Sequence, residues 1–209
     1  MSGPTKPNAM PWPEPASGSL DGRRQRSSRS RRQIIEALFA LLHEGDMSPS
    51  AAAVAERANV GLRTVFRHFE DMDSIYNEMT QEIMTAVKPK ITAPYEATRW
   101  RAQLMESIDK RADLYESIFP IKVCMSLRRF QSDFLAQQYA HDIRMERSAL
   151  KAILPAEVAK DRVLLAALES ALSFSNWRSL RQDQGLSVAN AKASVELTLR
   201  SLTEKVDTD

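Results

Sequence analysis

The chain has 209 residues, a formal net charge of +2 and 43% hydrophobic residues, so it can fold into one or two domains with a buried core. The small net charge excludes a protein that binds nucleic acid through its overall charge, and any such contact must come from local basic clusters. There is no apolar run of about 18 residues and no signal-type N-terminus, and the single cysteine, Cys124, cannot form an internal disulfide. These features favour a cytoplasmic protein without membrane contacts.

The first segment, residues 1–26, is rich in proline, serine and glycine, and we expect it to be a disordered N-terminal arm. It overlaps a basic run, Arg23–Arg32, which contains six arginines and no acidic residue. Such a run can be a solvated tail, or an arm that contacts phosphates or enters the minor groove of DNA. A DNA-binding unit directly after it would favour the second interpretation.

A helix is predicted from about Ser28 to His43, and Gly45 should end it. Apolar residues at spacings of three and four give this helix one face that is suited to a core. The expected buried residues are Ile34, Ile35, Leu38, Phe39 and Leu42.

Two short helices joined by a tight turn are predicted between Ser50 and Phe69. Ser50 is placed to cap the first helix, and Asn59 can end it because asparagine tolerates the left-handed conformation. Gly61 lets the second helix start close by but offers no side-chain cap. The expected buried residues are Ala51, Val54, Ala55 and Ala58 in the first helix and Leu62, Val65, Phe66 and Phe69 in the second. The pattern is typical of a helix-turn-helix, whose second helix enters the major groove, although an ordinary helical hairpin would also fit.

The run V-A-E-R-A-N-V-G-L-R-T-V-F-R-H-F (54–69) resembles the helix-turn-helix signature of the TetR family of transcriptional regulators. The matching positions are Val54, Ala55, Ala58, Val60, Thr64, Val65, His68 and Phe69. The chain departs from the family pattern at Asn59, Gly61, Phe66 and Met72, and the last two replace residues that could contact phosphate. The resemblance extends from about residue 28 to the end, and in the C-terminal part it is one of helix layout only.

The resemblance places DNA contacts on the second of these helices, and the position of the basic run directly before this unit favours DNA contacts from the run as well. Arg63 is predicted to read a base, because arginine can bond guanine through two hydrogen bonds. Ser50, Thr64, Arg67 and His68 are predicted mainly to hold phosphates. The other predicted DNA-binding residues are Leu62, Phe66, Arg29, Arg31 and Arg32.

The remainder is predicted to be helical. A fourth helix should start near Asp71, capped by Asp71 or Asp73, with a buried stripe of Ile75, Tyr76, Met79, Ile83 and Met84; Pro89 and Pro94 mark the end of this unit. Further helices are expected at about Ala97–Ser117, Ile121–Phe130, Asp133–Ile153, Ala156–Asp183 and Ser187–Lys205.

The fold class is therefore all-α with about nine helices. Residues 27–90 should form a DNA-binding domain, with a three-helix helix-turn-helix bundle and the linking fourth helix, and 91–209 a second helical domain. The resemblance implies that this second domain binds a ligand and dimerises through its last two helices.

No catalytic, metal-binding or cofactor-binding pattern is found. The histidines His43, His68 and His141 lie far apart, and none has a Cys or His partner at helical spacing. Cys124 is interpreted as a buried structural thiol, with redox sensing as the alternative. Candidate ligand contacts are large apolar or aromatic residues with polar neighbours, although each of them could simply be core: Trp100, Leu104, Ile108, Tyr115, Met125, Phe130, Phe134, Phe174, Asn176 and Trp177.

We interpret the chain as a one-component transcriptional regulator, first of all a repressor, and not an enzyme. Its expected partners are palindromic double-stranded operator DNA, a small-molecule effector and a second copy of the chain. The alternatives are a ligand-dependent activator, or a helical small-molecule binding protein or enzyme with an incidental helix-turn-helix.

Overall fold

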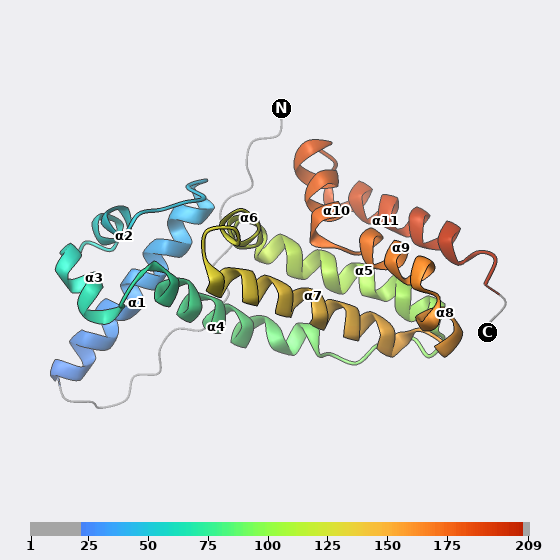
Figure 1. The fold of residues 1–209 in the computed structure, drawn as a ribbon, viewed down its shortest axis with the longest axis horizontal. Coiled ribbons are helices and arrows are strands. Elements are labelled where there is room, and N and C mark those ends of the chain that lie inside the picture. Colours follow the sequence, from blue (N-terminus) through green and yellow to red (C-terminus); the bar gives the residue numbers. More distant parts are fainter. Residues whose placement is uncertain (1–21, 207–209) are drawn as a thin grey trace. The chain divides into compact units, whose positions relative to one another are not determined.

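The computed structural model describes residues 22–206, and within this range every regular element is a helix, as the sequence predicts (Figure 1). The chain divides into two compact units. The first contains the described residues up to Pro89 together with Pro120–Gln137, and the second contains Lys90–Phe119 and the described chain from Gln138 onward. No helix between residues 22 and 206 is long and apolar enough to cross a membrane.

The first unit is built around α1 (Gly22–His43), α2 (Ala51–Arg57) and α3 (Leu62–His68), which pack against one another. The predicted apolar face of α1 is fully confirmed, since Ile34, Ile35, Leu38, Phe39 and Leu42 are all buried. Helix α4 (Met72–Ile91) follows, with Asp71 as its cap: the Asp71 carboxylate accepts from the Ser74 backbone N–H at 2.8 Å. Gly45 has a φ of 98°, the left-handed conformation that lets the chain leave α1.

The N-terminal boundary of α1 differs from the prediction. The helix begins at Gly22 instead of near Ser28, so residues 22–26 are helical and the basic run Arg23–Arg32 lies within α1. Arginine and glutamine are good helix formers, and the run contains no glycine or proline that would stop the helix from extending toward the N-terminus. The rest of the predicted disordered arm, residues 1–21, lies outside the described residues.

The first unit ends at Pro89, near the predicted domain boundary at residue 90, but Pro120–Gln137 also belongs to it. This segment contains most of α6 (Phe119–Arg128) and the start of α7 (Asp133–Ile153). Ser132 donates to the Asp73 carboxylate at 2.6 Å, and Arg128 donates to the Ser48 hydroxyl at 2.8 Å. Such pairs, separated by 59 and 80 positions, leave no periodic signal in the sequence.

The second unit contains α5 (Trp100–Ser117), the larger part of α7 and the last helices of the chain. Helix α11 (Val188–Thr203) packs against α5 and α9 (Arg162–Ala171). Leu104, Leu168 and Leu199 are completely buried in this unit. Ser187 caps α11 by accepting from the Asn190 backbone N–H, as its position in the sequence indicates.

The single helix predicted over Ala156–Asp183 is wrong. The segment forms α8 (Ala156–Lys160), α9, α10 (Phe174–Arg178) and a π-helical turn, η1 (Ser179–Asp183). Asp161 accepts from the backbone N–H groups of Val163 and Leu164, and Ser173 accepts from that of Asn176, so each starts a new helix. The apolar periodicity runs through both caps and conceals them. Residues 22–206 therefore contain eleven α-helices and one π-helical turn, more than the nine expected.

Two smaller differences concern α4. The helix continues through Pro89 to Ile91 and does not stop at that proline. Met84, which was predicted to be buried, is 40% exposed, whereas Ile75, Tyr76, Met79 and Ile83 are buried as expected. Met84 directly follows Ile83 and therefore points about 100° away from it around the helix.

Candidate nucleic-acid interface

The turn between α2 and α3 has the backbone geometry that its sequence predicts. The Ser50 hydroxyl accepts from the Ala53 backbone N–H at 3.1 Å, and Asn59 has a φ of 52°. Gly61 occupies the N-cap of α3 and makes no side-chain cap. The helix cap and the tight turn allow two helices of seven residues each to form a compact helix-turn-helix.

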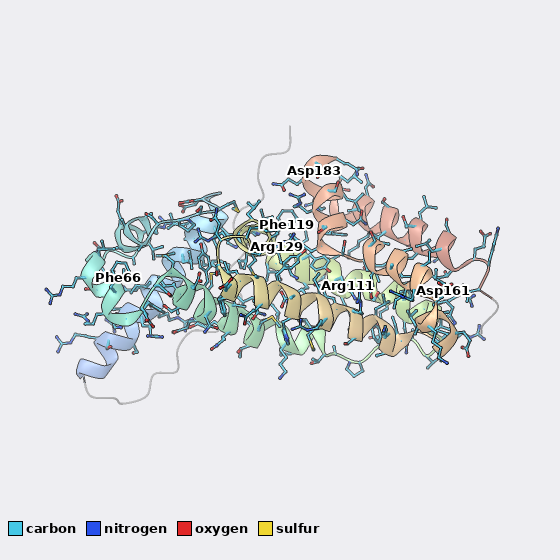
Figure 2. All side chains as sticks on the ribbon, in the orientation of Figure 1. Phe66, Arg111, Phe119, Arg129, Asp161 and Asp183 are labelled. Carbon is cyan, nitrogen blue, oxygen red and sulfur yellow. The ribbon has the colours of Figure 1, made fainter. Side chains whose placement is uncertain are left out.

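Helix α3 is attached to the unit by a narrower apolar stripe than predicted. Val65 and Phe69 are 1% and 2% exposed, but Leu62 and Phe66 are 44% and 51% exposed and therefore are not core residues (Figure 2). Since residues four positions apart share one side of a helix, Leu62 and Phe66 form an outward apolar ridge.

A second ridge on α3 is basic. Arg63 and Arg67, also four positions apart, are exposed, and α3 contains no acidic residue. Among the described residues, neither of these two arginines has an ion-pair partner. Helix α3 thus presents two unneutralised guanidinium groups beside exposed apolar side chains. Thr64 is half-buried at the side of this surface.

His68 lies at the end of α3 but is unsuited to a cationic phosphate contact. Burial lowers the pKa of His68, and repulsion from Arg67 and Arg31 lowers it further, so the imidazole is neutral near pH 7. Its Nε2 atom is buried and has no hydrogen-bond partner among the described residues.

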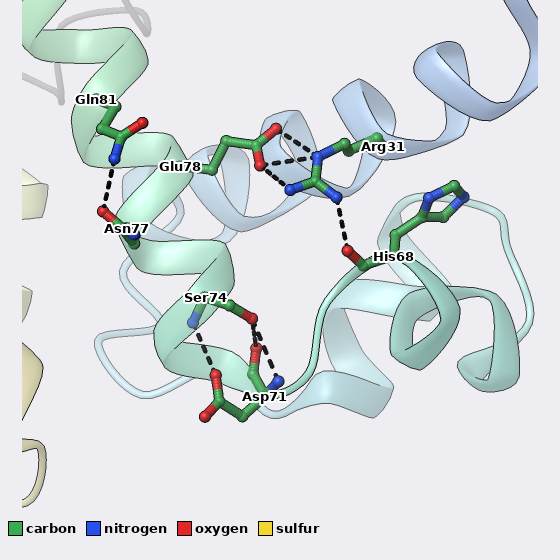
Figure 3. Close-up of polar contacts among 7 residues, drawn as sticks. All are labelled: Arg31, His68, Asp71, Ser74, Asn77, Glu78 and Gln81. Carbon is green, nitrogen blue, oxygen red and sulfur yellow. Dashed lines mark hydrogen bonds and ion pairs between the residues drawn. The ribbon is translucent and has the colours of Figure 1, made fainter. Parts of the chain in front are cut away.

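The three arginines predicted from the basic run occupy different environments in α1. Arg29 is exposed. Arg32 pairs with Glu36 at 2.9 Å. Arg31 is hydrogen-bonded to Glu78 on α4 and to the backbone carbonyl of His68 (Figure 3). The sequence prediction treated these arginines as one group of DNA contacts, whereas in the structure each has a different environment.

Cys124 is confirmed as a buried thiol. Burial raises its pKa, and its sulfur donates weakly to the Tyr76 hydroxyl at 3.7 Å. A reactive, redox-sensing cysteine requires an accessible thiolate, so this environment opposes the redox alternative.

The ligand contacts predicted from aromatic residues are mostly core. Tyr115 donates to the Leu172 carbonyl at 3.0 Å, Trp177 donates to Glu116 at 2.9 Å, and Asn176 donates to the Ala171 carbonyl at 2.8 Å. Their polar atoms are therefore occupied within the second unit. Trp100, Leu104, Ile108 and Phe174 are buried in the same unit.

Three further ligand candidates, Met125, Phe130 and Phe134, lie in the first unit. Met125 is buried and Phe134 is half-buried. Phe130 is 79% exposed, with the Arg129 guanidinium 4.7 Å from its ring centre, so it lines no cavity. The phenylalanine lies two residues beyond the end of α6.

The second unit contains a hollow of about 220 Å³ that the sequence did not reveal. Its apolar lining is Ile143, Leu150, Ala166 and Leu172, and its charged lining is Arg111, Glu146, Arg147 and Glu169. Arg147 and Glu169 join α7 to α9 through two hydrogen bonds of 2.5 and 2.7 Å. Of the predicted contacts, Ile108, Tyr115 and Trp177 line a space of only about 10 Å³.

Arg111 on α5 borders this hollow and makes only long contacts with its neighbours. Its closest approach to the Glu146 carboxylate is 3.9 Å, and its hydrogen bonds to the Glu146 carbonyl and the Tyr115 hydroxyl are 3.2 and 3.4 Å. The only residues in the sequence that could have indicated this hollow are arginines and glutamates on separate helices. In a sequence they cannot be distinguished from ordinary surface charges. Within residues 22–206, no group of acidic, histidine or cysteine side chains could hold a metal ion.

No protein-family model and no curated protein matches the chain. A solved structure of a transcriptional regulator from Rhodococcus sp. Rha1 is similar to it, with a TM-score of 0.63 over 88% of this chain and 98% of that chain. The two sequences are only 14% identical, so the likeness establishes a shared fold.

Proposed function

We propose that the chain is a one-component, ligand-responsive transcriptional regulator that binds palindromic double-stranded DNA as a homodimer and acts as a repressor. The observation that carries this proposal is the surface of α3, where Arg63 and Arg67 are exposed without acidic partners on a capped helix-turn-helix. The regulator from Rhodococcus with the same fold supports it.

In this proposal α3 lies in the major groove. Arg63 reads a guanine through two hydrogen bonds, and Arg67, Thr64, Ser50 and Arg29 hold phosphates and set the register. The neutral His68 and the exposed Leu62 and Phe66 contribute apolar contact to bases or sugars. A two-fold symmetric dimer places two such helices about 34–36 Å apart, or a multiple of this spacing, on a palindrome.

The dimer is proposed to form through the last helices of the second unit. Val163 on α9 and Leu197 on α11 are large apolar residues on two helices that pack together, and they are 81% and 69% exposed. Val163→Glu and Leu197→Glu should shift the chain from dimer to monomer in sedimentation experiments. If both variants remain dimeric, the interface lies elsewhere.

The effector is proposed to bind in the hollow beside Arg111. At about 220 Å³ the hollow is smaller than the roughly 300–1,000 Å³ of typical drug-sized sites, so a small ligand is expected. Such a ligand can change DNA affinity only if it binds two states of the protein unequally. We propose that α4 transmits the effect of the ligand to the helix-turn-helix, because α4 starts directly after it.

The test is a mobility shift with the duplex upstream of the protein's own coding region, at two salt concentrations and with nonspecific competitor. The proposal predicts a specific complex with two protein chains per duplex that weakens as salt rises. Weak, sequence-independent binding would reject the regulator function and favour a helical small-molecule binding protein. A reporter gene behind the bound duplex then distinguishes a repressor from an activator.

A further inference from the structure

Arg31 connects three helices of the first unit. Its Nε atom donates to both carboxylate oxygens of Glu78 on α4, at 2.8 Å each, and its Nη2 atom also bonds to that carboxylate. Its Nη1 atom donates to the backbone carbonyl of His68 at 2.6 Å, and its guanidinium carbon lies 4.4 Å from the centre of the Phe69 ring. Figure 3 shows the guanidinium between α4 and the end of α3.

This geometry engages all three nitrogens of the Arg31 guanidinium. Two edges of its planar fork are bonded, one to a carboxylate and one to a carbonyl, and one face lies over an aromatic ring. Releasing Arg31 to a phosphate would leave the Glu78 carboxylate, whose side chain is 26% exposed, without this cation. Arg29, two positions earlier in α1, is exposed and has no comparable contact with the described residues.

The contacts of Arg31 meet at the C-terminal end of α3. The carbonyl of His68 and the ring of Phe69 fix the position of the last turn of α3, and Phe69 also belongs to the core. Glu78 in turn fixes the guanidinium to α4. A change in the Arg31–Glu78 pair would therefore alter the angle at which α3 meets DNA.

We propose that Arg31 is a positioning residue that, together with Glu78, fixes the orientation of α3 for sequence-specific DNA recognition, and is not a phosphate contact. This inference rests on the proposed function, and it replaces the DNA-binding role that the sequence suggested for Arg31. The planar fork is essential, because a lysine would keep the positive charge but could not bond the carboxylate and the carbonyl in the same geometry.

The experiment is a double-mutant cycle with Arg31→Gln, Glu78→Gln and the combined variant, together with Arg31→Lys. Arg29→Gln is the matched control, since it removes an exposed arginine from the same helix. The DNA probes are a duplex selected by the wild-type protein from a random-sequence pool and a scrambled duplex of equal length. Affinities are measured over a salt series at a temperature where circular dichroism shows every variant to be folded.

Arg31→Gln, Arg31→Lys and Glu78→Gln should each lower the ratio of specific to nonspecific affinity, by on the order of tenfold for the glutamine variants, which corresponds to about 1.4 kcal/mol. The combined variant should lose no more than Arg31→Gln alone, because Arg31→Gln already breaks the contact with Glu78. Nonspecific affinity and its salt dependence should stay near wild type. Arg29→Gln should instead weaken both duplexes alike and reduce the salt slope by about one.

Two results would overturn the inference. If Arg31→Gln weakens both duplexes alike and reduces the salt slope while Glu78→Gln changes neither, Arg31 contacts phosphate. If the variants lower only the melting temperature and leave the specificity ratio unchanged, the contact is merely structural. A wild-type protein that prefers no selected duplex would instead reject the proposed function itself.

Discussion

Charged side chains have different roles on α3 of the first unit and around Glu116 in the second unit. In the first unit, Arg63 and Arg67 remain exposed without acidic partners on a helix held by Val65 and Phe69. In the second unit, Glu116 accepts hydrogen bonds from Trp177 and Arg181, so charges join helices far apart in sequence. The first unit also joins two of its helices through an ion pair, Arg31–Glu78, so what distinguishes α3 is that its two arginines remain without acidic partners among the described residues.

The largest expected effect tests how α3 is attached. Phe69→Ala should reduce the free energy of unfolding by about 3–5 kcal/mol, because a buried aromatic side chain is removed from the core. Phe66→Ala, three positions earlier on α3 and 51% exposed, should change it by less than about 0.5 kcal/mol. The free energies of unfolding of both variants can be measured by urea denaturation. Equal losses would contradict the packing of α3 through Val65 and Phe69.

The second effect tests the internal charge in the second unit. Glu116→Gln should cost about 1–3 kcal/mol of unfolding free energy, because the charged acceptor of Trp177 and Arg181 is lost. Glu169→Gln is the control, since its partner Arg147 is largely exposed and such pairs contribute about 0–1 kcal/mol. Equal effects in urea unfolding would contradict the distinction between these two glutamates.

Glu116 also predicts an acid-dependent loss of stability. Burial raises the pKa of Glu116, but hydrogen bonds from Arg181 and Trp177 outweigh burial and leave the pKa below its ordinary value of 4.5. The stabilisation is therefore present above pH 4.5 and is lost as the pH falls through the folded-state pKa. Unfolding of Glu116→Gln should depend less on pH in this range than unfolding of the wild type.

A smaller effect compares the helix caps of the two units. Ser50→Ala and Ser173→Ala should each cost about 1 kcal/mol, because each removes a side-chain acceptor from a helix N-terminus. Ser50→Ala should additionally weaken DNA binding under the proposed function, whereas Ser173→Ala should not. Melting temperatures and mobility shifts separate the two contributions, and equal DNA affinities for both variants would remove Ser50 from the interface.

The smallest expected effect concerns His43 at the end of α1. Burial lowers the pKa of His43 below its ordinary value of 6.5, so the folded state disfavours the protonated ring. Its contribution to stability is complete above pH 6.5 and is lost as the pH falls through the folded-state pKa. His43→Gln should therefore flatten the stability profile between pH 7 and 5. An unchanged profile would mean that His43 is already accessible to water.

Sequence-based prediction succeeded where a residue acts on nearby backbone in a recognisable pattern, and it failed where the pattern was concealed or the contact is distant in the chain. Ser50, Asn59 and Gly61 act on the backbone within a few residues, so their roles could be predicted and the structure agrees. The caps at Asp161 and Ser173 act just as locally, but an uninterrupted apolar periodicity concealed them. The hollow beside Arg111 depends on which helices meet, and no local pattern contains that information. The different roles of Arg29 and Arg31 likewise depend on the distant Glu78.

The most direct test of the central claim is the binding of Arg63→Ala to a selected palindromic duplex and to a scrambled one. If α3 reads DNA through Arg63, the variant should lose about 1–3 kcal/mol on the selected duplex, relax specificity at one base position in each half-site, and bind the scrambled duplex nearly as well as the wild type. An equal loss on both duplexes would show that Arg63 only holds phosphate, and it would contradict base recognition by Arg63.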